Sequence, residues 1–273
     1  MKKFLYPWVY LLSVFGSLHA AEVDTVLIYS VSMDKNIPAV VVKPDVYSID
    51  QKDFPVVFLL HGYSGNYLNW SQKTDLGALS DQYELLLVCP DGGYNSWYLD
   101  SPLDASSQYE THIIGEVIPF IDSTYRTITD RKGRAITGLS MGGQGALYLA
   151  ARHPDIFVAA SSMSGGVDLT YSTVKWEIAQ KLGSYEEYPQ RWRKHSAVNM
   201  VDLFKDHSLA LFIDCGVEDI FIQVNRQLHR RLLERNIPHV YIERPGGHSW
   251  EYWVNALPYH LLFFKQVFIN QGE

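Results

Sequence analysis

Six short apolar runs recur along the chain, and most of them end in a loop that contains glycine. They occupy residues 55–62, 84–92, 133–140, 157–165, 209–216 and 239–246. Because successive positions are apolar, these runs predict strands that are buried on both faces of a sheet. Two earlier strands are expected at 24–33 and 37–44, joined by a turn around residues 34–36.

Between the later strands, apolar residues recur at helical spacing. Such patterns occupy 111–125, 222–236 and 249–268. Pro119 must kink the first of these helices or start a shorter one, and the last contains Pro258. Strands that alternate with helices predict an α/β fold with a mostly parallel sheet, helices on both faces and one antiparallel edge. Ligands bind such sheets at the carboxyl ends of the strands, where the glycine loops should converge.

One segment breaks the alternation. Residues 171–203 are polar, aromatic and basic in patches, and they fall between two core strands. We interpret them as a small helical, cap-like insertion that shapes the acyl or leaving-group pocket, since insertions over a ligand face often carry function. The alternative is a surface excursion with no role in binding.

The first twenty residues have the pattern of a secretory signal peptide. Lys2 and Lys3 precede an apolar run that ends with small residues near Ala20 and Ala21. The run is shorter than the ~20 apolar residues of a membrane span, which argues against stable membrane insertion. We therefore expect a signal peptide at 1–20, one domain at 21–273, and a periplasmic or extracellular location.

Composition narrows the class of protein further. Of 273 residues, 47% are hydrophobic and 19% are charged, which suits one large core. The net charge is -7 and no basic stripe is present, so nucleic acid is not an expected partner. Cys89 and Cys215 each fall near the end of a predicted strand, and the sequence leaves open whether they are free.

The stretch Gly138-Leu139-Ser140-Met141-Gly142 matches G-x-S-x-G between a predicted strand and a predicted helix. This is the context of a nucleophile elbow, in which the serine occupies a strained turn at a helix N-terminus. The motif alone also fits a small residue in a tight turn. Ser140 is therefore a nucleophile only if the chain supplies a base and an acid in the right order.

His248 is the candidate base, because it alone of ten histidines follows the last strand in a Gly-Gly loop. The order that accompanies this motif is serine, then acid, then histidine. Asp219 and Glu218 both follow the preceding strand and fit the acid equally well on chemistry alone. Asp214 lies too deep in that strand.

Two backbone amides are needed to bind an oxyanion. Met141 follows the nucleophile and supplies one, and Tyr63 follows the strand that ends in His61-Gly62 and supplies the other. His61 and Gly62 are then parts of a backbone turn. The sequence contains no metal-ligand motif and no dinucleotide or phosphate loop, so neither a metal nor a cofactor is expected.

Six blocks together resemble the esterase D-like family of α/β-hydrolases. They are "FLLHGYSGNYLNW", "CPDGGYNSWYLDSP", "YETHIIGEVIPFID", "AITGLSMGGQGALYLAARHPDIFVAASSMSGG", "CGVEDIF" and "GGHSWEYW". This family includes S-formylglutathione hydrolases, tributyrin and feruloyl esterases, and the mycolyltransferases of the antigen 85 complex. The resemblance implies an α/β-hydrolase fold, and it covers nearly the whole chain after residue 20.

The resemblance also assigns residues. The "CG-x-x-D" loop implies that Asp219 is the acid in place of Glu218, and the turn after the first buried strand implies that Tyr63 supplies an oxyanion amide. The aromatic loop implies that Trp97 lines the substrate pocket. Glu110 matches a retained position and is interpreted as supporting the elbow or capping a helix.

The resulting hypothesis is an exported serine esterase that acts through Ser140, His248 and Asp219 on short-chain or aromatic acyl esters, including carbohydrate-linked acetyl or feruloyl esters. The alternative is a mycolyltransferase-like acyltransferase with the same three residues. A second alternative is a non-catalytic binding module on a hydrolase fold. The sequence does not determine the oligomeric state.

Overall fold

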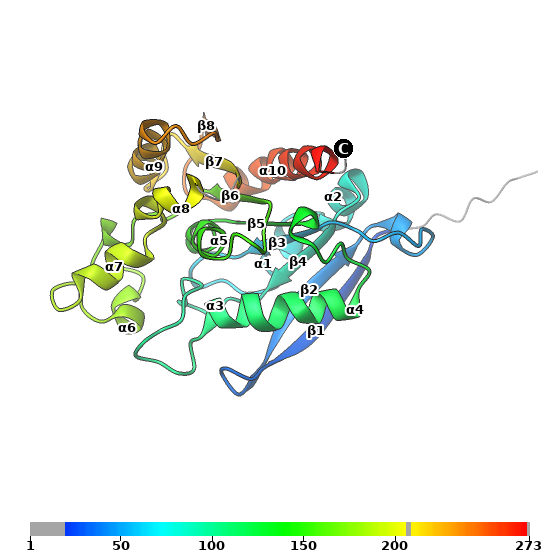
Figure 1. Ribbon diagram of the computed structural model, residues 1–273, viewed down its shortest axis with the longest axis horizontal. Coiled ribbons are helices and arrows are strands. Elements are labelled where there is room, and N and C mark those ends of the chain that lie inside the picture. The colour runs from blue at the N-terminus through cyan, green and yellow to red at the C-terminus, as the bar shows by residue number, and fades with distance from the viewer. Residues whose placement is uncertain (1–19, 206–208, 272–273) are drawn as a thin grey trace, which may run out of the picture.

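The computed structural model describes residues 20–205 and 209–271, which contain one eight-stranded sheet (Figure 1). All eight predicted strands are confirmed. Along the chain they are β1 Glu22–Ser30, β2 Lys35–Lys43, β3 Val56–Leu60, β4 Leu86–Pro90, β5 Arg134–Gly138, β6 Ala159–Met163, β7 Ala210–Gly216 and β8 Val240–Arg244. The predicted signal peptide lies, except for Ala20, outside the described residues.

The strand order in the sheet is β1-β2-β4-β3-β5-β6-β7-β8. β1 pairs with β2, and β2 with β4, in antiparallel fashion, while every later pair is parallel. The antiparallel edge expected from the two opening strands is therefore confirmed. The chain changes its direction of travel across the sheet at β3 and β5, and this switch point is where such sheets bind ligands.

Helices cover both faces of the sheet, each over its own apolar core. One face carries α3 (Tyr109–Thr111), the π-helix η2 (His112–Val117), α4 (Ile118–Thr124), α5 (Met141–Arg152) and α9 (Ile222–Glu234). The other carries α1 (Asn69–Lys73), α2 (Leu76–Tyr83) and α10 (Trp250–Asn270), which lies beside α2 in Figure 1. α5 lies between the sheet and the outer helices, so eleven of its residues are buried.

The remaining helices are short. They are η1 (Asp45–Tyr47), η3 (Arg131–Gly133), η4 (Leu169–Tyr171), α6 (Ile178–Leu182), α7 (Pro189–His195), η5 (Ala197–Asn199) and α8 (Val201–Lys205). α6 and α7 form one end of the molecule in Figure 1. The predicted insertion 171–203 is thus helical.

Pro119 acts as the sequence predicts. It stands in the first turn of α4, and the chain directly before it forms the π-helix η2. Pro258, by contrast, lies inside α10 without ending it.

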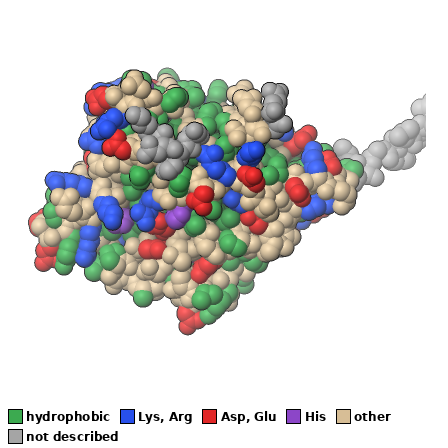
Figure 2. Space-filling view, viewed as in Figure 1, with side chains coloured by type: hydrophobic (Ala, Val, Ile, Leu, Met, Phe, Trp, Pro, Cys, Tyr) green, Lys and Arg blue, Asp and Glu red, His purple; other side chains and the backbone are tan. Residues whose placement is uncertain are grey.

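Three further observations concern the surface, the cysteines and the apolarity of the helices. On the face shown in Figure 2, basic and acidic side chains are interspersed with apolar ones, without a basic stripe. Cys89 and Cys215 are free and buried, and burial raises the pKa of both thiols. Across residues 20–205 and 209–271, none of the helices has the length and apolarity of a membrane span.

Candidate active site

Ser140 lies between β5 and α5 in a strained backbone conformation, with φ 54° and ψ -115°. Such angles are rare for a residue with a side chain and persist only where neighbours hold them. Here the Ser140 N–H donates to the Met163 carbonyl at 3.0 Å, and the Gly166 N–H donates to the Ser140 carbonyl at 3.2 Å. Two hydrogen bonds to the end of β6 therefore fix the turn.

The glycines of the motif are required by close packing of α5 on β3. A Cβ on Gly142 would lie 2.5 Å from the Leu60 carbonyl oxygen, and one on Gly138 would lie 2.5 Å from Gly142. Only residues without a side chain allow strand and helix to approach this closely. The sequence pattern thus has a steric cause that is independent of chemistry.

The structure brings Ser140, His248 and Asp219 together as one hydrogen-bonded chain. His248 Nε2 lies 2.9 Å from Ser140 Oγ, and His248 Nδ1 lies 2.9 Å from one Asp219 carboxylate oxygen and 3.0 Å from the other. The Asp219 side chain is fully buried and also accepts the Phe221 N–H at 2.8 Å. A carboxylate at Nδ1 fixes the tautomer that leaves Nε2 able to accept the serine proton.

The imidazole is also confined by aromatic rings. The rings of Phe221 and Trp253 pack edge-on against His248, with centroids 5.2 and 4.8 Å away. Contacts of this kind restrict the ring to one orientation, which a base needs if it is to remain aligned with Ser140.

The other two candidate acids are placed elsewhere. Glu218 is exposed and lines a neighbouring hollow beside Arg244. Asp214 is buried within β7, where Arg244 and Tyr252 donate hydrogen bonds to its carboxylate. Neither side chain is hydrogen-bonded to His248.

Tyr63 and Met141, the predicted oxyanion residues, flank Ser140 from two loops. Tyr63 lines the cavity with Ser140, and Met141 is the first residue of α5. Within the described residues, neither backbone N–H donates a hydrogen bond to the protein. His61 shapes the turn before Tyr63: its Nδ1 bonds the Gly62 carbonyl at 2.8 Å, and its Nε2 accepts the Gly92 N–H at 2.8 Å. Burial lowers the pKa of His61, in keeping with its interpretation as part of the turn.

A cavity of about 420 Å³ opens over Ser140. Its walls are small or polar residues on one side and aromatic rings on the other. They are Gly62, Tyr63, Ser64, Gly65, Asn69, Leu139, Ser140, Trp176, His248, Ser249, Trp250 and Trp253. Burial, with the neighbouring Tyr94 and Glu177, raises the pKa of the Tyr63 hydroxyl to about 12.

Trp97, which the sequence predicts to line the substrate pocket, is not among the residues that line this cavity. Its side chain is only 2% exposed and lies behind Trp176, to whose carbonyl the indole N–H donates at 3.2 Å. The Trp97 backbone N–H points to the Met141 sulfur at 3.4 Å. Trp97 therefore packs behind Trp176, which is one of the aromatic residues that line the cavity.

Trp176 is a site residue that sequence reasoning missed. It belongs to the segment 171–203 and is the one residue of that segment among those that line the cavity. Trp176 and Glu177 have φ values of 57° and 54°, so a strained turn carries the ring to the site. In the sequence, the available signal was a single tryptophan between β6 and α6. It belongs to no periodic pattern of apolar residues, so the pattern did not predict that it lines the cavity.

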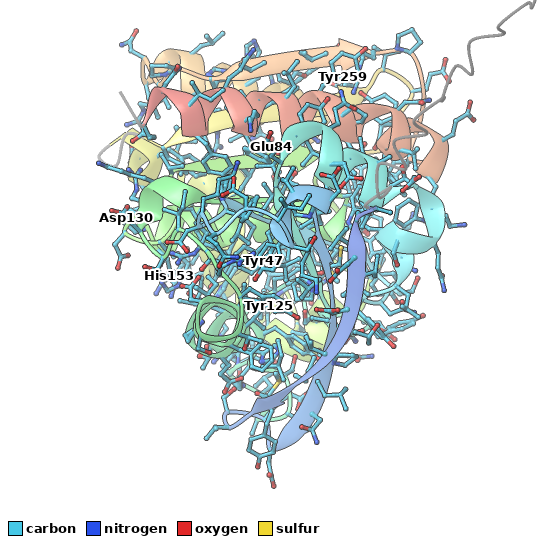
Figure 3. All side chains as sticks on the ribbon, turned by 90° about the vertical axis from the view of Figure 1, so that its right-hand side faces the viewer. Tyr47, Glu84, Tyr125, Asp130, His153 and Tyr259 are labelled. Carbon is cyan, nitrogen blue, oxygen red and sulfur yellow. The ribbon has the colours of Figure 1, made fainter. Side chains whose placement is uncertain are left out.

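Glu110 supports α5 at the end farthest from Ser140. Its carboxylate accepts hydrogen bonds from Tyr148 at 2.6 Å and Arg152 at 2.7 Å, and lies 2.8 Å from His153 Nε2. Figure 3 labels His153, which follows the last residue of α5. Burial alone would raise the pKa of Glu110, but these three partners lower it to about 2. The interpretation as a supporting residue agrees with these contacts.

Among the residues that the structure describes, no group of three or more His, Cys, Asp or Glu side chains is arranged to hold a metal ion. The site contains a serine hydroxyl, an imidazole, a buried carboxylate and two backbone amides without a partner in the described protein, beside an aromatic cavity. These are the parts that acyl transfer through a serine requires.

The family model described as "Putative esterase" matches residues 30–264. An acetyl esterase from Caldicellulosiruptor saccharolyticus is 28% identical over 245 residues, covering 82% of this chain and 91% of the relative. The solved structure of a ferulic acid esterase superposes with a TM-score of 0.81 at 29% identity, covering 92% of this chain and 99% of the other. Diacylglycerol acyltransferase/mycolyltransferase Ag85B from Mycobacterium leprae is 25% identical, covering 73% of this chain and 72% of the relative.

The sheet topology and its structural neighbours define an α/β-hydrolase. The chain belongs to the Esterase family, and as a member it is a carboxylic ester hydrolase. The resemblance that the six motif blocks indicated is thereby confirmed.

Proposed function

We propose that the protein is a serine esterase in which Ser140 is the nucleophile, His248 the general base and Asp219 the residue that orients the base. The observation that carries this proposal is the continuous chain of hydrogen bonds from Ser140 Oγ through His248 to Asp219. A base within 3.2 Å of a nucleophile, itself held by a third group, is the arrangement that activates a serine hydroxyl.

The reaction has two steps. In acylation, Ser140 Oγ bonds to the ester carbonyl carbon, His248 takes the hydroxyl proton, and the carbonyl electrons move onto the oxygen. The carbonyl then re-forms, the bond to the alcohol oxygen breaks, and His248 protonates the departing alcohol. In deacylation, water repeats the sequence against the acyl-enzyme, releasing a carboxylic acid and Ser140.

The amides of Tyr63 and Met141 are proposed to bind the oxyanion. Both N–H groups are unpaired within the described protein, and both belong to residues beside Ser140. Met141 also stands at the N-terminus of α5, where the helix dipole favours negative charge. A donor that is already in place needs no reorganisation when charge develops on the carbonyl oxygen.

The substrates we propose are short-chain or aromatic acyl esters, including carbohydrate-linked acetyl or feruloyl esters. The aromatic wall of Tyr63, Trp176, Trp250 and Trp253 supports an aromatic acyl group, because flat rings stack favourably on one another. The similarity to an acetyl esterase and to a ferulic acid esterase supports both parts of this range.

The test is pre-steady-state hydrolysis of p-nitrophenyl acetate by the wild type and by Ser140→Ala. We expect a burst of one p-nitrophenol per active site, an acetylated Ser140 peptide in mass spectra of trapped enzyme, and neither in Ser140→Ala. A Ser140→Ala variant with wild-type turnover would overturn the nucleophile assignment. Product analysis with an added acceptor alcohol decides between hydrolysis and transfer: faster ester exchange than acid release would make the protein an acyltransferase.

We also propose that the protein is exported after cleavage near Ala20. The support is the positive, apolar and small-residue pattern of residues 1–20. N-terminal sequencing of protein recovered from the periplasm or the medium should begin at residue 21 or close to it. A cell-associated chain that begins at Met1 would contradict this proposal.

A further inference from the structure

Asp214 carries a negative charge into the core of the molecule. It belongs to β7, its side chain is 0% exposed, and it lies outside the hydrogen-bonded chain of Ser140, His248 and Asp219. Its two carboxylate oxygens are used separately: the Tyr252 hydroxyl donates to one, and an Arg244 guanidinium nitrogen donates to the other. His260 Nε2 lies 3.5 Å from the second oxygen.

These two donors flank the loop that carries His248. Arg244 is the last residue of β8, four positions before His248, and Tyr252 is in the first turn of α10, four positions after it. Both ends of residues 245–251 are therefore attached to one carboxylate. The loop itself is further tied to the neighbouring turn, since the Glu218 N–H donates to the Gly246 carbonyl at 3.0 Å.

The attachment is reinforced by ring contacts. The Arg244 guanidinium lies 5.3 Å from the Tyr252 ring centroid and 4.6 Å from that of Tyr259, which Figure 3 labels on α10. On the other side, His260 stacks on Phe212 with centroids 4.1 Å apart. Asp214 is thus enclosed by groups from β7, β8 and α10.

The charges favour an ionised Asp214. Burial by itself raises the pKa of a carboxyl group, but the nearby His260, the hydrogen bond from Tyr252 and the charge of Arg244 hold the pKa of Asp214 below its ordinary value. Burial lowers the pKa of His260. The guanidinium of Arg244 is a permanent cation beside Asp214. A buried carboxylate that loses its charge would loosen both attachments at once.

We infer that Asp214 is a positioning residue for the base: through Arg244 and Tyr252 it holds the His248 loop so that Nε2 stays within hydrogen-bond distance of Ser140 Oγ. This inference rests on the proposed function, because it assigns Asp214 a purpose only if His248 is the base. The roles of the two aspartates then differ. Asp219 contacts the imidazole, and Asp214 acts through the backbone on either side of it.

The experiment compares Asp214→Asn and Tyr252→Phe with a matched control, Tyr259→Phe. Tyr259 stacks on the same guanidinium but its hydroxyl is not bonded to Asp214. For each variant, kcat and KM for p-nitrophenyl acetate are measured from pH 5 to 9, and active sites are counted by the end point of titration with an organophosphonate. Dividing kcat by titrated sites removes any loss that is due to unfolded protein.

We expect kcat per titrated site to fall about 10- to 100-fold in Asp214→Asn and about 10-fold in Tyr252→Phe, with KM changed less than threefold. The alkaline plateau of the pH profile should fall with kcat, and Tyr259→Phe should match the wild type. In the double variant the losses should not multiply, because both act on one attachment.

Asp214→Asn with normal kcat per titrated site, even if fewer sites titrate, would show a purely structural role and overturn the inference. If Asp214→Asn does not fold, the conservative Tyr252→Phe variant is the test. A normal kcat per titrated site in Tyr252→Phe would then overturn the inference. Failure of the proposed function is distinguishable, because it shows in Ser140→Ala and not in these variants. An active Ser140→Ala would overturn the nucleophile assignment, on which the role of His248 as base depends.

Discussion

Asp219 and Glu218 are neighbours in the chain, yet only the Asp219 carboxylate reaches His248, with oxygens 2.9 and 3.0 Å from Nδ1. Glu218 is exposed and faces a hollow on the other side of the loop. Chemistry alone allowed either acid. The structure separates them by the direction in which each side chain leaves the turn after β7.

This separation predicts unequal effects of two matched substitutions. Asp219→Asn should lower kcat by about 10²- to 10⁴-fold, because an amide no longer favours the His248 tautomer that accepts the serine proton. Glu218→Gln should stay within threefold of the wild type. Steady-state hydrolysis of p-nitrophenyl acetate measures both, and equal losses in the two variants would contradict the assignment of the acid.

The position of Trp176 predicts a change in acyl preference. Trp176→Ala removes one aromatic wall, so kcat/KM for methyl ferulate should fall by roughly 10- to 100-fold, as expected for losing about 1.5–3 kcal/mol of ring contact. The value for an acetate ester should change less than threefold. Trp176→Phe should restore most of the loss, and Val174→Ala, at a side chain 89% exposed in the same segment, serves as the control. A uniform loss across acyl groups would show that Trp176 does not contact the acyl chain.

Two glycines predict opposite outcomes for the same substitution. In Gly216→Ala the new Cβ would lie 2.2 Å from the Gly246 carbonyl oxygen, so the His248 loop must move. We expect about 1–3 kcal/mol lower stability and at least tenfold lower kcat. In Gly115→Ala the Cβ meets nothing within 4 Å, and stability should be equal or up to about 1 kcal/mol higher. Urea unfolding measures the stability of each variant, and steady-state hydrolysis measures kcat. If stability and kcat were both unchanged in Gly216→Ala, the His248 loop would be free to adapt and the prediction would be wrong.

Glu110 predicts a pH dependence of stability. Its partners lower its pKa from 4.5 to about 2, so the unfolded chain binds the proton more tightly. The stabilisation is present above pH 4.5 and is lost as pH falls from about 4.5 to about 2. With solvent screening it should be on the order of 2 kcal/mol. Glu110→Gln should flatten the urea-unfolding stability over this window, whereas Glu186→Gln, at an exposed side chain, should not. An unchanged slope in Glu110→Gln would contradict the assignment.

The sequence by itself determined the order of the strands and of the loops that carry the predicted site residues. Continuous apolar runs required strands buried on both faces, and the loops after β5, β7 and β8 had to meet at one edge because parallel strands end on the same side. Ser140 and His248 were predicted in this way, since chain order and strand ends are properties of the pattern. The pattern left Asp219 and Glu218 equal, and the family resemblance chose Asp219.

Only the tertiary structure decided which side chains face the site. Trp97 is turned behind Trp176 because both residues lie in strained loops whose direction is set by packing. Asp214 appeared too deep in β7 to act, and its connection to the His248 loop through Arg244 and Tyr252 joins segments thirty or more residues apart. No local periodicity records such contacts, because they arise only when distant strands and helices enclose the same volume.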